Sequence, residues 1–140
     1  MRDLQQGKRL DQLIVVSRQS ENETYRIGDL ASEFGVTLRT LRFYEDRGLI
    51  QPRREGSTRL YSEEDRARLG VILLAKQVGF SLVEIQEVLQ ILDSCEELDD
   101  PVGKLAEKFA GQMDVLKGQK AEIESAIDKL SDTIRTLTQD

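Results

Sequence analysis

Residues 25–50 read YRIGDLASEFGVTLRTLRFYEDRGLI, and their pattern predicts two short helices joined by a tight turn. Apolar residues recur at helical spacing over residues 27–34. Gly35 follows the last of them, at a position where a helix commonly ends in the left-handed conformation that glycine adopts at little cost. Thr37 can cap a second helix over residues 38–47. The stretch is therefore expected to form a pair of helices around a glycine turn.

The spacing inside this pair is typical of a helix-turn-helix. The first helix needs a small residue where the second crosses it, the turn needs a left-handed residue, and the second helix needs an apolar residue facing back. Ala31, Gly35 and Leu41 supply these features. The outward stripe of the second helix would then present Arg39, Arg42, Phe43 and Asp46. Arginine there can form paired hydrogen bonds with guanine in the major groove, although an ordinary helical hairpin with a solvated charged face would show the same pattern.

Residues 52–61 predict a β-hairpin directly after the helix pair, with Gly56 at its tip. The side chains that flank the tip and close the hairpin are Arg53, Arg54, Arg59 and Tyr61. A wing of this kind beside a recognition helix can reach phosphates, which fix position and affinity without reading the base sequence. The alternative is a solvated charged loop, and the position next to a helix-turn-helix favours the wing.

The charge of the chain is unevenly distributed. The net charge is −6, which by itself disfavours a polyanionic partner. Residues 93–140 hold 12 acidic and 6 basic side chains and carry all of that charge, since residues 1–92 hold 14 of each. Residues 37–60 contain six arginines against three acidic side chains, a local charge of +3. This basic island within an acidic chain favours a surface that binds nucleic acid.

Two more helices are expected after the hairpin, so the fold class is mainly α. Ser62 opens a capping-box pattern with Asp65, predicting a helix to Val78. Ser81 opens a second one with Glu84, predicting a helix to about residue 92. The content of only two prolines and 5% aromatic residues also argues against an all-β protein.

A heptad pattern runs from residue 102 almost to the end and predicts a long coiled-coil helix. Its inner positions are Val102, Ala106, Phe109, Met113, Leu116, Lys120, Ile123, Ile127, Leu130, Ile134 and Leu137. Only Lys120 is polar, and a helix of this length would span roughly 55 Å at 1.5 Å per residue. So long a seam exceeds any surface of the small head, which favours a partner helix over a helix folded back on its own chain. The seam residues assigned to dimerisation are Phe109, Met113, Leu116, Ile123, Ile127, Leu130, Ile134 and Leu137.

Several classes of protein are disfavoured by what the sequence lacks. With no histidine and one cysteine, it offers no internal disulfide, no metal cluster and no nucleophile–base pair, so we expect neither an enzyme nor a bound metal or cofactor. No stretch reaches the roughly 18 apolar residues of a membrane span, which favours a cytoplasmic protein without a membrane partner. Two further segments are expected outside the predicted head and long helix. Residues 94–101 form an acidic linker that contains Cys95. Residues 1–24 are expected to form a flexible extension.

The motifs taken together resemble the MerR family of bacterial transcription regulators. The resemblance is carried by YRIGDLA at residues 25–31, GVTLRTLRFYEDRGLI at 35–50, RLYSEED at 59–65 and QVGFSLVEI at 77–85. Their order is specific, and they extend over about residues 25–92. We therefore expect a short family member, with a winged helix-turn-helix head over residues 25–93 and a dimerisation helix over residues 102–140.

The resemblance also implies how the protein would act. Arg39 and Arg42 would reach the major groove, Tyr44 would reach a phosphate, and Arg59 and Tyr61 would belong to the wing. The long helices would pair as an antiparallel coiled coil in a homodimer. Family members commonly bend and untwist the spacer between two promoter elements so that RNA polymerase engages both. The predicted DNA-binding residues are Thr37, Arg39, Thr40, Arg42, Phe43, Tyr44, Arg53, Arg54, Arg59 and Tyr61.

The chain departs from the family pattern in two places. The wing tip reads GSTR at residues 56–59 and lacks an aromatic residue often found there. Cys95 resembles a cysteine of metal-sensing relatives, but no second cysteine follows, so we expect a lone thiol. Two other functions remain as alternatives: an architectural protein that bends DNA without regulating one promoter, and a coiled-coil adaptor whose head binds protein.

Overall fold

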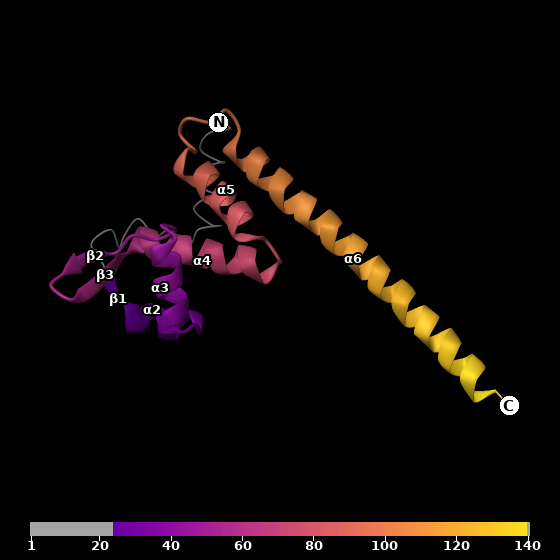
Figure 1. The fold of residues 1–140 in the computed structure, drawn as a ribbon. Coiled ribbons are helices and arrows are strands. Elements are labelled where there is room, and N and C mark those ends of the chain that lie inside the picture. Colours follow the sequence, from indigo (N-terminus) through magenta and orange to yellow (C-terminus); the bar gives the residue numbers. More distant parts are fainter. Residues whose placement is uncertain (1–23, 140) are drawn as a thin grey trace. The chain divides into compact units, whose positions relative to one another are not determined.

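The computed structural model describes residues 24–139, and the described part is mainly helical, as predicted (Figure 1). The expected flexible extension lies outside the described residues apart from Thr24. The chain divides into two compact units, and the boundary between them lies between Val102 and Gly103. The elements are β1 (Thr24–Arg26), α2 (Ile27–Phe34), α3 (Leu38–Asp46), β2 (Arg53–Glu55), β3 (Thr58–Ser62), α4 (Glu63–Gln77), α5 (Leu82–Asp93) and α6 (Pro101–Thr138).

Helices α2 and α3 form the predicted helix-turn-helix. Gly35 ends α2 in the left-handed conformation, with φ of 65°, and its N–H donates to the carbonyl of Ala31. Thr37 caps α3 by accepting a hydrogen bond from the backbone N–H of Thr40 at 3.1 Å. Leu41 is fully buried in α3, as its predicted inward position requires. The turn, the cap and the inward apolar residue are therefore confirmed.

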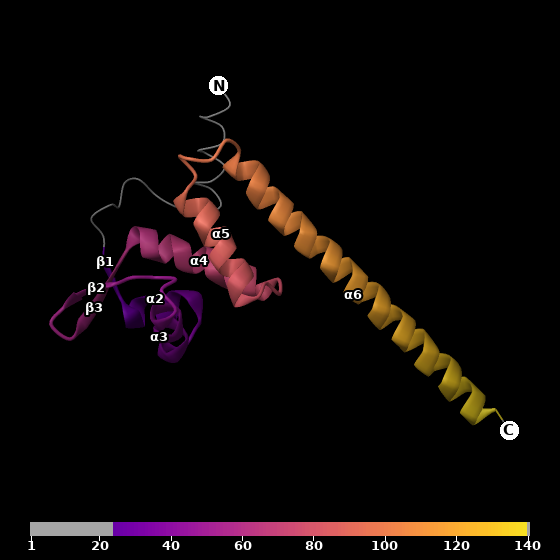
Figure 2. The same cartoon turned by 45° about the horizontal axis from the view of Figure 1, so that its top comes forward.

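Strands β2 and β3 form the predicted hairpin and belong to a three-stranded sheet of order β1-β3-β2. The hairpin turns at Gly56, which has φ of 63°, and it projects from the head in both views of the ribbon (Figures 1 and 2). Strand β1, whose Tyr25 pairs with Tyr61, was not predicted. A strand of three residues is too short to show the alternation by which strands are recognised in a sequence.

Helices α4 and α5 begin at the two predicted capping boxes and enclose the core of the head. Ser62 and Ser81 each accept a hydrogen bond from a backbone N–H three residues ahead, and the side chains of Asp65 and Glu84 accept one in return. Because these bonds satisfy N–H groups that lack a partner within the helix, they fix where each helix begins. The fully buried side chains include Leu69, Ile72 and Val88.

An ion-pair network joins β1, α2 and α4. The Nε group of Arg66 on α4 donates to Glu33 on α2 at 2.9 Å, and its Nη1 donates to Glu63 at 2.7 Å. The hydroxyl of Tyr25 on β1 donates to the other oxygen of Glu63 at 2.6 Å. The hydrogen bond from Arg66 and its charge together hold the pKa of the Glu33 carboxyl below its ordinary value, against a smaller opposing effect of burial.

Helix α6 is continuous from Pro101, one residue before the predicted start, to Thr138. Phe109 is half-buried. The remaining residues of the predicted dimerisation seam are exposed, namely Met113, Leu116, Ile123, Ile127, Leu130, Ile134 and Leu137. Among residues 24–139, no helix combines the length and apolar character that a membrane crossing requires.

Candidate nucleic-acid interface

The outer face of α3 carries the stripe expected of a recognition helix. Arg39, Arg42 and Asp46 are exposed, and the Phe43 ring is 42% exposed. The guanidinium carbon of Arg47 lies 5.1 Å from the centre of that ring. The face therefore presents two unobstructed guanidinium groups beside an aromatic surface, a combination suited to reading base edges.

The N-terminal end of α3 adds short polar side chains to this face. Thr37 is exposed and Thr40 is half-buried, and their hydroxyl oxygens lie 3.0 Å apart. The Thr37 side chain therefore accepts from the backbone N–H of Thr40 and also lies within hydrogen-bond distance of the Thr40 hydroxyl. Both predicted threonines lie on the same helix end as Arg39.

A single carboxylate ties the wing to α3. Glu45 on α3 accepts from Nε of Arg59 at 2.7 Å through one oxygen and from Nη2 of Arg54 at 3.2 Å through the other. Arg53, the remaining predicted wing cation, pairs with Glu55 at 3.1 Å, and both of these side chains are largely exposed. All the predicted wing arginines therefore carry a carboxylate partner within the head.

Glu45 is a site residue that reasoning from the sequence missed, since it was counted only as a negative charge. A signal for it was present in the predicted hairpin. Arg54 and Arg59 face each other across β2 and β3. Like charges in directly opposite positions destabilise a strand pair, so a nearby counter-ion is favoured.

The two tyrosines predicted to bind DNA are Tyr44 on α3 and Tyr61 on the wing strand β3. The side chains of Tyr44 and Tyr61 are buried, and their hydroxyls have no hydrogen-bond partner among the described residues. Burial raises the pKa of Tyr61, and the nearby charge of Glu45 raises it further. In this conformation neither hydroxyl can touch a phosphate, because the packing that fills the space beneath α3 and the wing covers both. Burial favours a packing role for both side chains over the expected contact with DNA.

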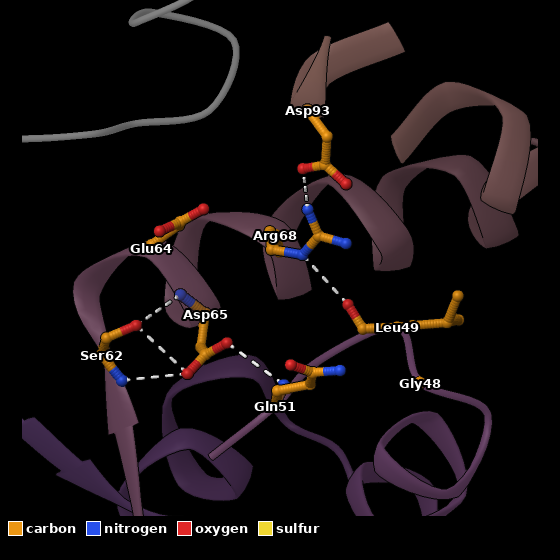
Figure 3. A pocket seen from close by; sticks show the side chains of 8 residues that line it. All are labelled: Gly48, Leu49, Gln51, Ser62, Glu64, Asp65, Arg68 and Asp93. Carbon is orange, nitrogen blue, oxygen red and sulfur yellow. Dashed lines mark hydrogen bonds and ion pairs between the residues drawn. The ribbon is translucent and has the colours of Figure 1, made fainter. Parts of the chain in front are cut away.

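Helix α4 fixes the segment that leads from α3 into the wing. The carboxylate of Asp65 accepts from the backbone N–H of Gln51 at 3.3 Å, and Nε of Arg68 donates to the carbonyl of Leu49 at 3.0 Å. Figure 3 shows Arg68 reaching between Leu49 and Asp93, whose carboxylate it also binds. These side chains line a polar pocket of about 400 Å³. The exit from the recognition helix is thereby anchored to the rest of the head.

The described residues hold no group of three or more histidine, cysteine, aspartate or glutamate side chains placed to bind a metal ion. Cys95 is half-buried and forms no disulfide.

Comparison with known proteins identifies two family regions along the chain. Residues 25–92 match the family described as MerR HTH family regulatory protein, and residues 66–139 match the one described as MerR, DNA binding. The HTH-type transcriptional regulator ZntR of Escherichia coli (strain K12) is 36% identical over 115 residues, which cover 81% of this chain and 75% of ZntR.

Solved structures agree with the sequence comparison. HiNmlR, described as a MerR family regulator lacking the sensor domain and bound to promoter DNA, matches with a TM-score of 0.57 and 27% identity, covering 76% of this chain and 80% of that one. The N-terminal part of MtaN, the Bacillus subtilis multidrug transporter activator, matches with a TM-score of 0.64 and 31% identity, covering 82% of this chain and 99% of that one. The chain therefore belongs to the MerR family: it is a DNA-binding transcription regulator and not an enzyme.

Proposed function

We propose that this regulator binds promoter DNA as a homodimer, with α3 in the major groove and the wing on flanking phosphates. The observation that carries the proposal is the exposed face of α3, where Arg39 and Arg42 stand beside the wing on an otherwise acidic chain. The description of HiNmlR as bound to promoter DNA supports the same use of the head. The proposed contact residues are Thr37, Arg39, Thr40, Arg42 and Phe43 on α3, with Arg53, Arg54 and Arg59 on the wing.

The homodimer is proposed because of the apolar seam on α6. Ile127 and Leu130 are 58% and 64% exposed, and Ile123 is 60% exposed. Burying apolar side chains of this size against a partner helix is favourable by about 25 cal/mol for each Å² removed from water. A second copy of the same helix offers a matching seam, and the family resemblance implies that the pair is antiparallel.

We further propose that the dimer distorts the spacer between two promoter elements and thereby acts on RNA polymerase in the cytoplasm. Two heads joined by paired helices contact DNA at two separated places, so that bending or untwisting between them changes how the flanking elements face the polymerase. Distortion of this kind needs phosphate contacts beside the recognition helix, and the arginines of the wing would supply them.

The test begins by selecting DNA fragments of the host genome with the full-length protein and sequencing those retained. Footprinting on the best fragment is expected to show one protected region confined to a promoter spacer, with enhanced cleavage at its centre where the duplex is deformed. Transcription from that fragment by the host polymerase should change when the protein is added. Arg39→Ala should lose the preference for this fragment over random DNA.

The same footprint separates the alternatives. Uniform protection along all fragments, with no effect on transcription, would indicate an architectural protein. Absence of retained DNA would contradict the proposed function and favour a head that binds protein.

A further inference from the structure

Among the described residues, one carboxylate shared by two arginines makes the side-chain hydrogen bonds between the wing and α3. Arg54 and Arg59 lie in paired positions on β2 and β3, where their charges repel. Glu45 gives one oxygen to each of them, and its side chain is only 16% exposed. The carboxylate is therefore an integral part of the head rather than a solvated surface charge, and no other pairing of Arg54 or Arg59 is seen among residues 24–139.

The two elements joined by Glu45 have different tasks in the proposed complex. α3 contacts base edges, which carry sequence information, whereas the wing contacts phosphates, which do not. Because Arg59 uses Nε to bind Glu45, its two terminal nitrogens can still donate to a phosphate. The same holds for the free nitrogens of Arg54, which binds through Nη2 alone. Glu45 can thus hold both arginines while they contact DNA.

The shared carboxylate also opposes binding to the wrong DNA. Arg54, Arg59 and Glu45 together carry one net positive charge instead of two. Contacts with phosphates are the main source of non-specific affinity, and that affinity grows with each phosphate neutralised. Glu45 therefore limits the attraction of the wing to any duplex, while it keeps the wing in a fixed position relative to the base-reading side chains of α3.

We propose that Glu45 is a specificity-determining positioning residue, which locks the phosphate-binding arginines of the wing in register with the recognition helix. The inference rests on the proposed DNA-binding function and adds a residue that contacts neither bases nor phosphates. Without Glu45, the wing binds phosphates independently of the register of α3, so correct and incorrect sequences become more alike.

The test compares two duplexes, one selected by the wild-type full-length protein from a random pool and one of scrambled sequence. For Glu45→Gln, the ratio of the two affinities should fall about tenfold, as expected for loss of one charge-assisted hydrogen bond. Affinity for the scrambled duplex should rise, and its logarithmic dependence on salt should become steeper by about 0.9, equivalent to one more phosphate neutralised.

Two further variants separate register from charge. Glu45→Asp keeps the charge but is too short to serve both arginines, so the ratio should fall while the salt dependence on scrambled DNA stays unchanged. Glu55→Gln removes a carboxylate that pairs with Arg53 within the wing, so it should strengthen binding to both duplexes equally and leave the ratio unchanged. Thermal unfolding of each variant shows whether the head is intact, and Glu45→Asp decides the matter if Glu45→Gln does not fold.

The possible outcomes are distinct. If Glu45→Gln and Glu45→Asp change both affinities by the same factor, or if Glu55→Gln lowers the ratio as much as they do, the proposed role of Glu45 is overturned while the DNA-binding function stands. If the wild type prefers no duplex from the pool, the proposed function fails and the role of Glu45 fails with it.

Discussion

The head and the long helix differ in how far their apolar side chains are buried. In the head, Leu30, Leu41 and Ile72 are fully buried among α2, α3 and α4. On α6, Ile127 and Ile134 are 58% and 59% exposed although they are equally apolar. The head buries its core side chains within one chain, whereas the apolar seam of α6 is exposed over most of its described length.

This difference separates the folding of a single chain, which depends on the head, from association between chains, which depends on α6. Substitutions in the head should act first on folding, because the affected side chains pack against the same chain. Substitutions on the seam of α6 should act first on association, and through it on DNA affinity.

The largest effect is expected for Ile127→Asp on the seam of α6. A charge at the centre of the proposed dimer interface would separate the helices, and single heads lose the gain of binding two sites at once. Affinity for the selected promoter fragment should fall by about 10²-fold or more. Sedimentation should show monomers, and a mobility-shift titration gives the affinity.

Ser125→Asp is the matched control, because it adds the same charge on the outer face of the same helix two residues away. It should stay dimeric and keep its affinity. An Ile127→Asp protein that still sediments as a dimer would contradict the assignment of the seam.

Within the head, Leu41→Ala should destabilise the fold by about 2–5 kcal/mol, because it removes a fully buried side chain at the contact of α2 and α3. Chemical denaturation monitored by circular dichroism measures this loss. Phe43→Ala, on the exposed face of the same helix, should change stability by less than about 1 kcal/mol. It should weaken DNA binding instead, and equal destabilisation by both changes would show that α3 has no distinct outer face.

The sequence predicted most of the fold because its signals there are local. The glycine turn at Gly35, the caps at Thr37, Ser62 and Ser81, and the family resemblance all depend on residues close together in the chain. Each is confirmed by the structure or the comparisons. The heptad likewise predicted α6.

What could not be predicted depends on contacts between distant segments. β1 is held by pairing with β3, whose residues lie 34–38 positions later in the chain. Glu45 acquires its role only once the hairpin brings Arg54 and Arg59 above α3. The burial of Tyr44 and Tyr61 is likewise not visible in the sequence, because hydropathy does not distinguish an exposed tyrosine from a buried one.

Two glycine substitutions extend the comparison of the regions to the backbone. Gly35→Ala should destabilise the head by about 1–2 kcal/mol, because a side chain disfavours the left-handed conformation even where space is open. Gly118→Ala on the outer face of α6 should stabilise the long helix by about 1 kcal/mol, since alanine favours the helix. Thermal unfolding measures the stability of both variants. A change of the same sign in Gly35→Ala and Gly118→Ala would contradict the different roles given to these two glycines.

A smaller effect is expected from removing a buried hydroxyl. Tyr61→Phe should leave DNA affinity unchanged and keep or raise stability by up to about 1 kcal/mol, because the hydroxyl has no partner among the described residues. Tyr25→Phe is the control, since its hydroxyl binds Glu63, and it should lose about 1 kcal/mol. A large loss of DNA affinity in Tyr61→Phe would show that the Tyr61 hydroxyl contacts DNA.

The smallest expected effect concerns acid stability and the pair of Glu33 with Arg66. Binding to Arg66 lowers the pKa of Glu33 from its ordinary value of 4.5. A lowered pKa in the folded state means that the pair stabilises the head above that value, and that this contribution disappears as the pH falls through the folded pKa. Glu33→Gln should therefore cost up to about 1 kcal/mol at neutral pH, a modest figure because the pair is partly exposed.

The cost of Glu33→Gln should shrink toward zero in acid, where the wild-type carboxyl is protonated and resembles the amide. Denaturation of both proteins at neutral pH and at acid pH values well below 4.5 measures the difference, and other carboxylates cancel because both proteins contain them. Asp132→Asn on α6 is the control, since its pair with Arg135 is 3.5 Å long with both side chains largely exposed. It should change stability little at any pH. A Glu33→Gln cost that persists unchanged in acid would show that side-chain packing, and not charge, joins α2 to α4.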